Sequence, residues 1–178
     1  LSPDSKWVLV NVPSTPARLM VYPTGVGEPR RIDAGELEAY SDGHWLSDGK
    51  SLFVCGNAAG KAPRCYVRSL DAKDIRPVTP EGVDRGVVAP DGKSVVVRRV
   101  TGEFLSCPVD GGTPRPLPFM APDDRLIRFS PDGTKVWVLL GHRVEGVDLA
   151  SGRRETILEL GVSRGAGMTN VTDIALAD

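Results

Sequence analysis

Short apolar stretches of four or five residues, separated by turns rich in glycine, proline and aspartate, follow one another along the whole chain. Most of them contain valine, leucine or aromatic residues, which favour strands. No stretch of the sequence keeps an apolar period of 3.6 residues for three turns. The best helical candidate, 34–40, is expected to form a single turn within a loop. The pattern therefore predicts an all-β protein.

One turn signature recurs four times at nearly constant spacing. Its copies occupy 2–6, 46–50, 89–93 and 130–135. The central aspartates are 44, 43 and 41 residues apart, at Asp4, Asp48, Asp91 and Asp132. Proline presets the first central position of a type I turn, aspartate suits the next, and glycine takes the left-handed position that closes the hairpin. We therefore expect each copy to join two antiparallel strands within a repeated unit.

Each unit contains four predicted strands. The first strand precedes the turn, at 43–46, 86–89 and 126–130. The second follows it, at 7–10, 51–54, 94–97 and 136–139. The third is predicted at 19–22, 65–68, 104–107 and 144–147, and the fourth at 29–32, 75–78, 114–117 and 154–157. Four antiparallel strands in just over forty residues predict the blade of a β-propeller, with a proline-rich outer edge that resists aggregation.

The Ser-Pro-Asp-Gly turn, the apolar strand after it and a third strand such as Cys65-Tyr66-Val67 resemble the TolB-type, WD-repeat-like β-propeller repeat of bacteria. The resemblance covers essentially the whole chain. The same repeat is found in the propellers of prolyl oligopeptidase relatives and in C-terminal sensor regions of some bacterial Ser/Thr kinases. Eukaryotic WD repeats fit less well, because the sequence has no Trp-Asp dipeptide. The family includes scaffolds, sensors and substrate gates, so the fold alone does not assign a function.

The expected organisation is a single β-propeller domain or propeller fragment spanning 1–178. Its repeats are expected at approximately 1–47, 48–90, 91–131 and 132–178. The first repeat lacks an innermost strand, and 171–178 is predicted to form one. Two interpretations remain open: a part of a larger propeller, or a four-bladed ring in which this last strand completes the first blade. An open arc would expose apolar sheet faces and favour a homodimer.

Composition and charge narrow the classes of partner. A formal net charge of −1 argues against a nucleic-acid surface. No apolar run reaches the length of a membrane-spanning helix, so direct membrane insertion is not expected. The resemblance favours an extracytoplasmic or periplasmic location, which the residues alone leave open.

Two local motifs are similar to catalytic or cofactor signatures. The segment 161–165 matches Gly-x-Ser-x-Gly, but a nucleophile elbow needs a strand-to-helix turn and a later histidine. Gly49-Lys50-Ser51 and Gly92-Lys93-Ser94 are similar to the end of a phosphate-binding loop, yet a strand rather than a helix is predicted after each. We interpret all three as loop or blade-turn residues and expect no catalytic residue and no cofactor.

The three cysteines allow two interpretations. Cys55 and Cys65 flank the predicted hairpin between the second and third strands of one repeat and could form a disulfide across it. Such a bond would suit an extracytoplasmic setting. Alternatively, these two residues and Cys107 pack as buried thiols. No pair has metal-site spacing, and His44 and His142 are the two imidazoles of the chain, so no metal site is expected.

The innermost strands of a propeller line its channel, and the loops that enter them form one rim. Each repeat places an aspartate near this entry, with basic or imidazole groups soon after, including Arg125. The candidate ligand-binding residues are Asp42, His44, Asp84, Arg85, Asp124, Arg128 and Asp173. Convergent charges there could bind a polar ligand, a peptide or a cation. The alternative is that they are solvated turn residues, and Trp45 is expected to fill the gap between blades rather than line the channel.

Two classes of function follow. The first is a non-catalytic propeller module for protein or peptide binding or for sensing, within a larger bacterial protein, as the resemblance to TolB-like propellers implies. The second is a propeller that gates an attached hydrolase, as in prolyl oligopeptidase relatives. A propeller with its own active site would need carboxylates or histidines clustered on one rim.

Overall fold

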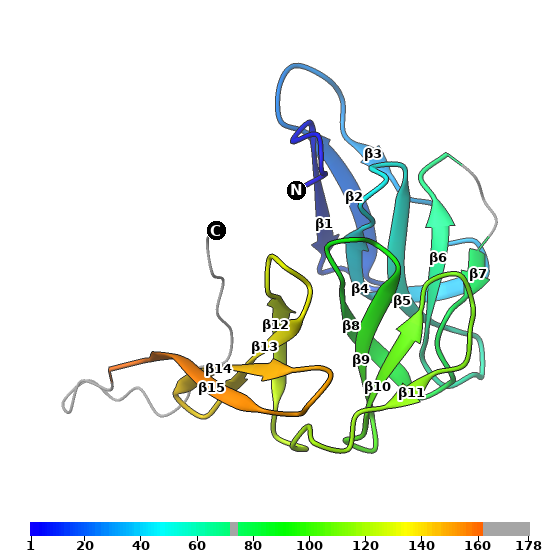
Figure 1. Cartoon of the computed structure of the whole chain (residues 1–178). Helices are drawn as coiled ribbons and strands as arrows, with labels where there is room; N and C mark the ends of the chain where they lie inside the picture. Colours follow the sequence, from blue (N-terminus) through cyan, green and yellow to red (C-terminus); the bar gives the residue numbers. More distant parts are fainter. Residues whose placement is uncertain (72–74, 162–178) are drawn as a thin grey trace.

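The computed structural model describes residues 1–71 and 75–161 (Figure 1). In these residues the chain forms fifteen strands and no helix. The strands make four separate antiparallel sheets in which neighbours along the chain pair with one another. We call these sheets blades 1 to 4, in chain order. The predicted all-β propeller of four-stranded antiparallel blades is therefore confirmed, with three strands in the described part of blade 1.

The blades have the following strands. Blade 1 contains β1 (Trp7–Val12), β2 (Arg18–Pro23) and β3 (Arg30–Arg31). Blade 2 contains β4 (Leu37–Trp45), β5 (Ser51–Ala58), β6 (Arg64–Ser69) and β7 (Ile75–Pro77). Blade 3 contains β8 (Val83–Val88), β9 (Ser94–Arg99), β10 (Phe104–Pro108) and β11 (Arg115–Pro116). Blade 4 contains β12 (Arg125–Phe129), β13 (Lys135–Leu140), β14 (Arg143–Asp148) and β15 (Arg154–Glu159).

The recurring turn has the predicted geometry. In blade 3, the carboxylate of Asp91 accepts a hydrogen bond from the backbone nitrogen of Lys93 at 2.9 Å, and Gly92 has a φ of +70°. The corresponding carboxylates of the other turns accept equivalent bonds from the residue two positions later. In blade 1 the left-handed position is held by Ser5, with a φ of +59°. The turns of blades 2, 3 and 4 thus each connect two strands through a left-handed glycine, as the repeat predicts, and the turn of blade 1 leads into β1.

Side chains that alternate along the second strand of a blade pack against two different neighbours. In β5, Leu52 and Val54 belong to the apolar cluster shared with blade 1, whereas Phe53 and Cys55 belong to the cluster shared with blade 3. A third cluster fills the junction between blades 3 and 4. The hydrophobic core is therefore a series of three junctions, each built from the facing sides of two sheets.

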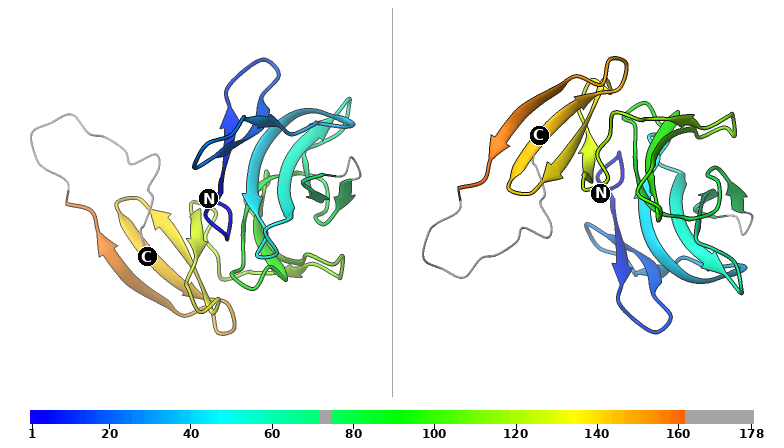
Figure 2. Two further views of the ribbon diagram at one scale, coloured as in Figure 1. Left: turned by 90° about the horizontal axis from the view of Figure 1, so that it is seen from above. Right: turned by 90° about the horizontal axis from the view of Figure 1, so that it is seen from below.

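The four sheets fan out around a common axis (Figure 2). Contacts run in chain order: β1 lies beside β4, β4 beside β8, and β8 beside β12. The described strands of blades 1 and 4 make no comparable contact with each other. The described part of the chain is therefore an arc of blades whose two end sheets are not packed together.

Two expectations are corrected by the structure. The segment 34–40 was expected to be a loop turn, but only its start is one, with the Leu37 nitrogen donating to the Ala34 carbonyl at 3.0 Å. Strand β4 begins at Leu37, because Leu37 and Tyr40 are buried in the junction with blade 1. The interpretation in which Cys55, Cys65 and Cys107 are all free thiols is also wrong, because two of them form a disulfide.

Cys55 and Cys65 are paired directly across β5 and β6 and form a disulfide. Cys107 is a free thiol buried in the same junction. Burial raises the pKa of Cys107 to about 11, so this thiol stays protonated at neutral pH. The disulfide and the thiol both act here as apolar packing between blades 2 and 3.

Candidate functional site

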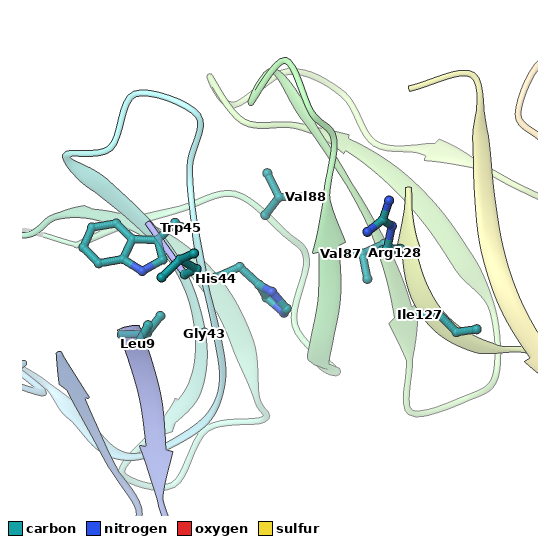
Figure 3. A pocket seen from close by; sticks show the side chains of 9 residues that line it. Leu9, Gly43, His44, Trp45, Val87, Val88, Ile127 and Arg128 are labelled. Atoms are coloured by element: carbon teal, nitrogen blue, oxygen red, sulfur yellow. The ribbon is translucent and has the colours of Figure 1, made fainter. Parts of the chain in front are cut away.

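The innermost strands converge on a cavity of about 380 Å³ near the axis of the arc. Figure 3 shows its side chains, which come from blades 1 to 4. The lining residues are Leu1, Leu9, Gly43, His44, Trp45, Val87, Val88, Ile127 and Arg128. Most of the lining side chains are apolar, yet polar atoms make up the larger part of the cavity surface, and His44 and Arg128 carry its charged or chargeable side chains. Such a mixture of apolar area with a few polar groups is typical of ligand sites.

Asp42 and His44 form a pair that also connects two blades. The imidazole Nε2 of His44 lies 3.1 Å from Oδ1 and 3.2 Å from Oδ2 of Asp42. The same carboxylate accepts a hydrogen bond from the backbone nitrogen of Gly43 at 2.9 Å and one from Gly86, in blade 3, at 3.2 Å. Asp42 therefore orients the imidazole at the cavity while joining the innermost strands β4 and β8.

This pairing shifts the pKa values of both groups. Burial is the largest influence on each and disfavours its charged form, but the hydrogen bond and the opposite charge outweigh it. As a result, the pKa of His44 is raised above its ordinary value of 6.5. The pKa of Asp42 is lowered below 3.8, helped by the two backbone donors. The pair is therefore stabilised in its charged form.

Arg128 reaches the cavity from β12. Its guanidinium carbon lies 4.9 Å from the centre of the Trp137 ring, a distance typical of a cation–π contact. Its Nε also donates to the carbonyl of Phe129 at 3.3 Å. Figure 3 shows Arg128 on β12 and His44 on β4, with β8 between these two strands. Blades 2 and 4 thus each supply one basic group to the space around β8.

Trp45 combines the two roles considered for it. Its ring packs against the cluster between blades 1 and 2, as expected, and it also lines the cavity. The indole nitrogen Nε1 is buried and has no hydrogen-bond partner among the described residues. A buried donor without a partner carries a desolvation cost, which a ligand acceptor could relieve.

Asp84 and Arg85 lie at the start of β8 and do not line the cavity. The Asp84 carboxylate is 3.5 Å from Nε of Arg85, and the Arg85 side chain is 68% exposed. The Asp84 carbonyl accepts a hydrogen bond from the Ser41 hydroxyl at 2.7 Å. They form a solvent-accessible pair at the start of β8.

Asp124 is not exposed at a rim. It is buried, with its side chain paired to Arg154 of β15, which also contacts Glu145 at 3.2 Å. The backbone nitrogen of Ala121 donates to the Asp124 carboxylate at 2.7 Å. Burial, the largest influence, raises the pKa of Asp124 despite these partners. This network holds the entry loop of blade 4 against the outer strand β15, so the expected rim position of Asp124 is corrected to an internal one.

Asp173 and the predicted strand 171–178 lie outside the described residues. The apolar lining of the cavity, including Leu9, Val87 and Ile127, was absent from the sequence-based candidates. The available signal was the alternation along the innermost strands, which assigns one side of each strand to the axis. Among residues 1–71 and 75–161, no group of three or more histidine, cysteine, aspartate or glutamate side chains could hold a metal ion. No helix able to cross a membrane occurs in these residues either.

Comparisons with known proteins indicate which fold the chain has. No family model matches the sequence. The chain is 29% identical over 89 residues to the protein named uncharacterized peptidase YuxL of Bacillus subtilis strain 168, which covers 49% of this chain and 13% of that protein. The structure is similar to TolB of Acinetobacter baumannii, with a TM-score of 0.72 and 19% identity over 90% of this chain and 42% of that one.

A second similar structure is the putative TolB of Agrobacterium tumefaciens, with a TM-score of 0.71 and 20% identity over 89% of this chain and 60% of that one. The chain thus has the fold of a TolB-like β-propeller. It spans less than two thirds of each of these proteins.

Proposed function

We propose that this chain is a non-catalytic propeller module that binds an acidic peptide, or an acidic segment of a protein, at the axial cavity. The observation that carries this proposal is the position of His44 and Arg128 on two different blades around one cavity that also has apolar side chains in its wall. The TolB-like fold supports it, because a rigid arc of blades presents side chains from several strands at one place.

The chemistry of the wall selects the ligand class. Leu9, Val87 and Val88 offer apolar contact area, while a protonated His44 and the guanidinium of Arg128 attract a carboxylate. The raised pKa of His44 increases the fraction of charged imidazole near neutral pH. An acidic side chain flanked by apolar residues therefore matches this surface better than a basic one.

The setting of this module is a larger bacterial protein in an oxidising compartment. The Cys55–Cys65 disulfide supports an extracytoplasmic or periplasmic location, where such bonds persist. In that protein the exposed Asp84–Arg85 pair would extend the binding surface along the rim of blade 3. Asp42 would act through His44, whose imidazole it orients.

The test uses two fluorescein-labelled peptides, one alternating leucine with glutamate and one alternating leucine with lysine. We expect binding of the acidic peptide by fluorescence anisotropy. The His44→Gln/Arg128→Gln double variant should bind it about tenfold or more weakly. Lys61→Gln, an exposed change in the turn between β5 and β6, serves as the control and should bind normally.

The thermal midpoint of the double variant is measured in parallel, to separate lost binding from lost folding. Equal binding of both peptides, or unchanged binding by a folded double variant, would contradict the proposal. A charge-reversed Asp84→Lys/Arg85→Glu variant then tests the rim. If the bound segment reaches the edge of blade 3, this variant also weakens binding, and by a smaller factor.

A second function is favoured by one comparison. The protein that matches 89 residues of this chain is named as a peptidase. A propeller that gates an attached hydrolase predicts an α/β-hydrolase sequence in the same protein. In that case a change that blocks the axial cavity, such as Val87→Trp, should slow the cleavage of long peptides more than that of dipeptide esters. Equal slowing would count against a gate.

A further inference from the structure

Basic and apolar side chains lie next to one another in the wall of the axial cavity. On β4, His44 is followed directly by Trp45, and on β12, Ile127 is followed directly by Arg128. All four residues line the cavity. Each basic group in the wall therefore has an apolar neighbour in the chain, and an occupant meets charge and apolar surface at nearly the same place.

A β-bulge produces this arrangement on β12. Successive side chains of a regular strand point to opposite sides, so two consecutive residues do not normally face one cavity. The pairing of β12 with β13 shifts between Leu126 and Arg128, which leaves Ile127 as the extra residue. A bulge of this kind changes the direction of the side chains around it. It therefore accounts for the position of both Ile127 and Arg128 in the cavity wall.

The size of the cavity restricts what it can hold. Strand β8 lies between β4 and β12 and adds Val87 and Val88 to the wall (Figure 3). The cavity that the described residues form has a volume of about 380 Å³. This is roughly the volume of a dozen water molecules, which leaves room for about one or two amino-acid residues. The chain end of a partner fits this space better than a long segment does.

Two kinds of acidic occupant differ in where their apolar groups lie. In an extended segment, the neighbours of a glutamate point to the opposite side, and the next side chain on the same side is about 6.5 Å away. A glutamate therefore brings its charge into the cavity without an apolar companion. A C-terminal residue carries its carboxylate and its side chain on the same carbon atom. It brings charge and apolar surface together, as the wall requires.

We propose that the axial cavity captures the C-terminal residue of a peptide or protein, one with an apolar side chain and a free carboxylate. This inference rests on the proposed function and states which carboxylate of the partner is bound. The side chain packs on Val87 and Val88, and the carboxylate lies against His44 and Arg128. Capture of a terminal carboxylate is a recurring mode of peptide recognition.

The two basic groups have enough hydrogen-bond donors for this role. A protonated imidazole has two N–H donors, and the bond to Asp42 uses Nε2 of His44. A guanidinium has five, and the bond to the Phe129 carbonyl uses Nε of Arg128. Both side chains can therefore keep these partners and also donate to a carboxylate in the cavity, in charge-assisted bonds stronger than neutral ones.

The experiment compares three peptides, each labelled with fluorescein at the N-terminus, by fluorescence anisotropy. The first is a short glycine-serine peptide that ends in leucine with a free carboxylate, the second is its C-terminal amide, and the third ends in serine with a free carboxylate. We expect the leucine acid to bind about tenfold or more tightly than the amide, which lacks the charge. It should also bind about tenfold or more tightly than the serine acid, which lacks the apolar side chain.

Protein variants locate the effect. In the His44→Gln/Arg128→Gln double variant, the difference between the leucine acid and its amide should disappear. Lys61→Gln, the exposed change in the turn between β5 and β6, should preserve it. The thermal midpoint of each variant is measured in parallel to show that the protein is folded. A difference that persists in the folded double variant would place the carboxylate elsewhere and overturn the inference.

A fourth peptide separates this inference from the proposed function. It alternates leucine with glutamate and ends in an amide, so all of its carboxylates are on side chains. If it binds as tightly as its own free acid, and the double variant abolishes that binding, the proposed function stands and the inference is overturned. Equal binding of the leucine acid and its amide would overturn the inference as well. If none of the peptides binds, both proposals are wrong.

Discussion

The junction between blades 2 and 3 differs sharply from the two ends of the arc, although all are made by the same repeat. Phe53, Val95 and Val97 are inaccessible to solvent in the junction, whereas Tyr22 and Ile157 expose more than a third of their surface at the ends. The alternation of apolar residues is the same in both places. The repeat therefore specifies a surface for stacking, and in the central junction the neighbouring blade completes the burial of these side chains.

The largest predicted difference comes from truncating an aromatic side chain in each region. Phe53→Ala should lower the free energy of unfolding by about 3–5 kcal/mol, because it leaves a cavity inside the central junction. Tyr22→Ala should lower it by less than about 1 kcal/mol, since that ring is partly solvated. Both values come from urea denaturation of dilute protein, where association of subunits does not contribute. Similar losses for the two variants would contradict the comparison.

Replacing one glycine by alanine in each region makes the same comparison, because each replacement adds a single methyl group. A Cβ at Gly86, on an innermost strand of the junction, would lie 2.6 Å from Cγ1 of Val97 and 2.9 Å from the Val96 carbonyl oxygen. We expect Gly86→Ala to reduce stability by about 1–3 kcal/mol. Gly25, in a turn of blade 1, has no atom within 4 Å of that position. Gly25→Ala should leave the denaturation midpoint nearly unchanged, and an equal shift for both would be evidence against tight packing at the axis.

The smallest predicted effect is on how the stability of the fold depends on pH, and it compares the two histidines. The raised pKa of His44 means that its pairing with Asp42 stabilises the fold fully below pH 6.5, and that this contribution is lost as the pH rises through the folded-state pKa. The lowered pKa of Asp42 means that its own contribution is present above pH 3.8 and is lost at lower pH. The pair should therefore stabilise the fold most between these two values.

His44→Gln should remove the loss of stability on the alkaline side of this window. The change should be below about 1 kcal/mol, because the imidazole is 40% exposed and solvent screens the pair. His142→Gln, in the exposed turn between β13 and β14 of the end blade, is the control. It should keep the wild-type pH dependence measured by thermal unfolding from pH 5 to pH 8. A His142→Gln profile that matches that of His44→Gln would contradict the assignment.

The fold could be predicted because its determinants are local. The Pro-Asp-Gly turns fix the hairpins through a left-handed glycine, as at Gly92, and short apolar stretches mark the strands on either side. Strand β4 was predicted too short because its first residues alternate irregularly, with register shifts near Leu37 and Tyr40. Their strand character depends on burial against blade 1, which is a contact between units rather than a property of the segment.

The site was less predictable, because it depends on distances between blades. His44 and Arg128 were identified from their position near the innermost strands, and both line the cavity. Asp124 occupies a similar place in the repeat, yet Arg154 from the outer strand draws it into the blade. Sequence spacing does not reveal that partner, which lies 30 residues further along the chain. The Cys55–Cys65 pairing likewise depends on the register of β5 and β6, which the sequence left open.

Hydrogen exchange of the backbone amides, followed strand by strand, tests the central claim most directly. The account predicts that amides of β5 and β9, in the second strands of the two inner blades, exchange the slowest. Their counterparts in β1, which is an edge strand of an end blade, should exchange much faster in dilute protein. Equal protection of β1, β5 and β9 would contradict a structure in which stability resides in the junctions between stacked blades.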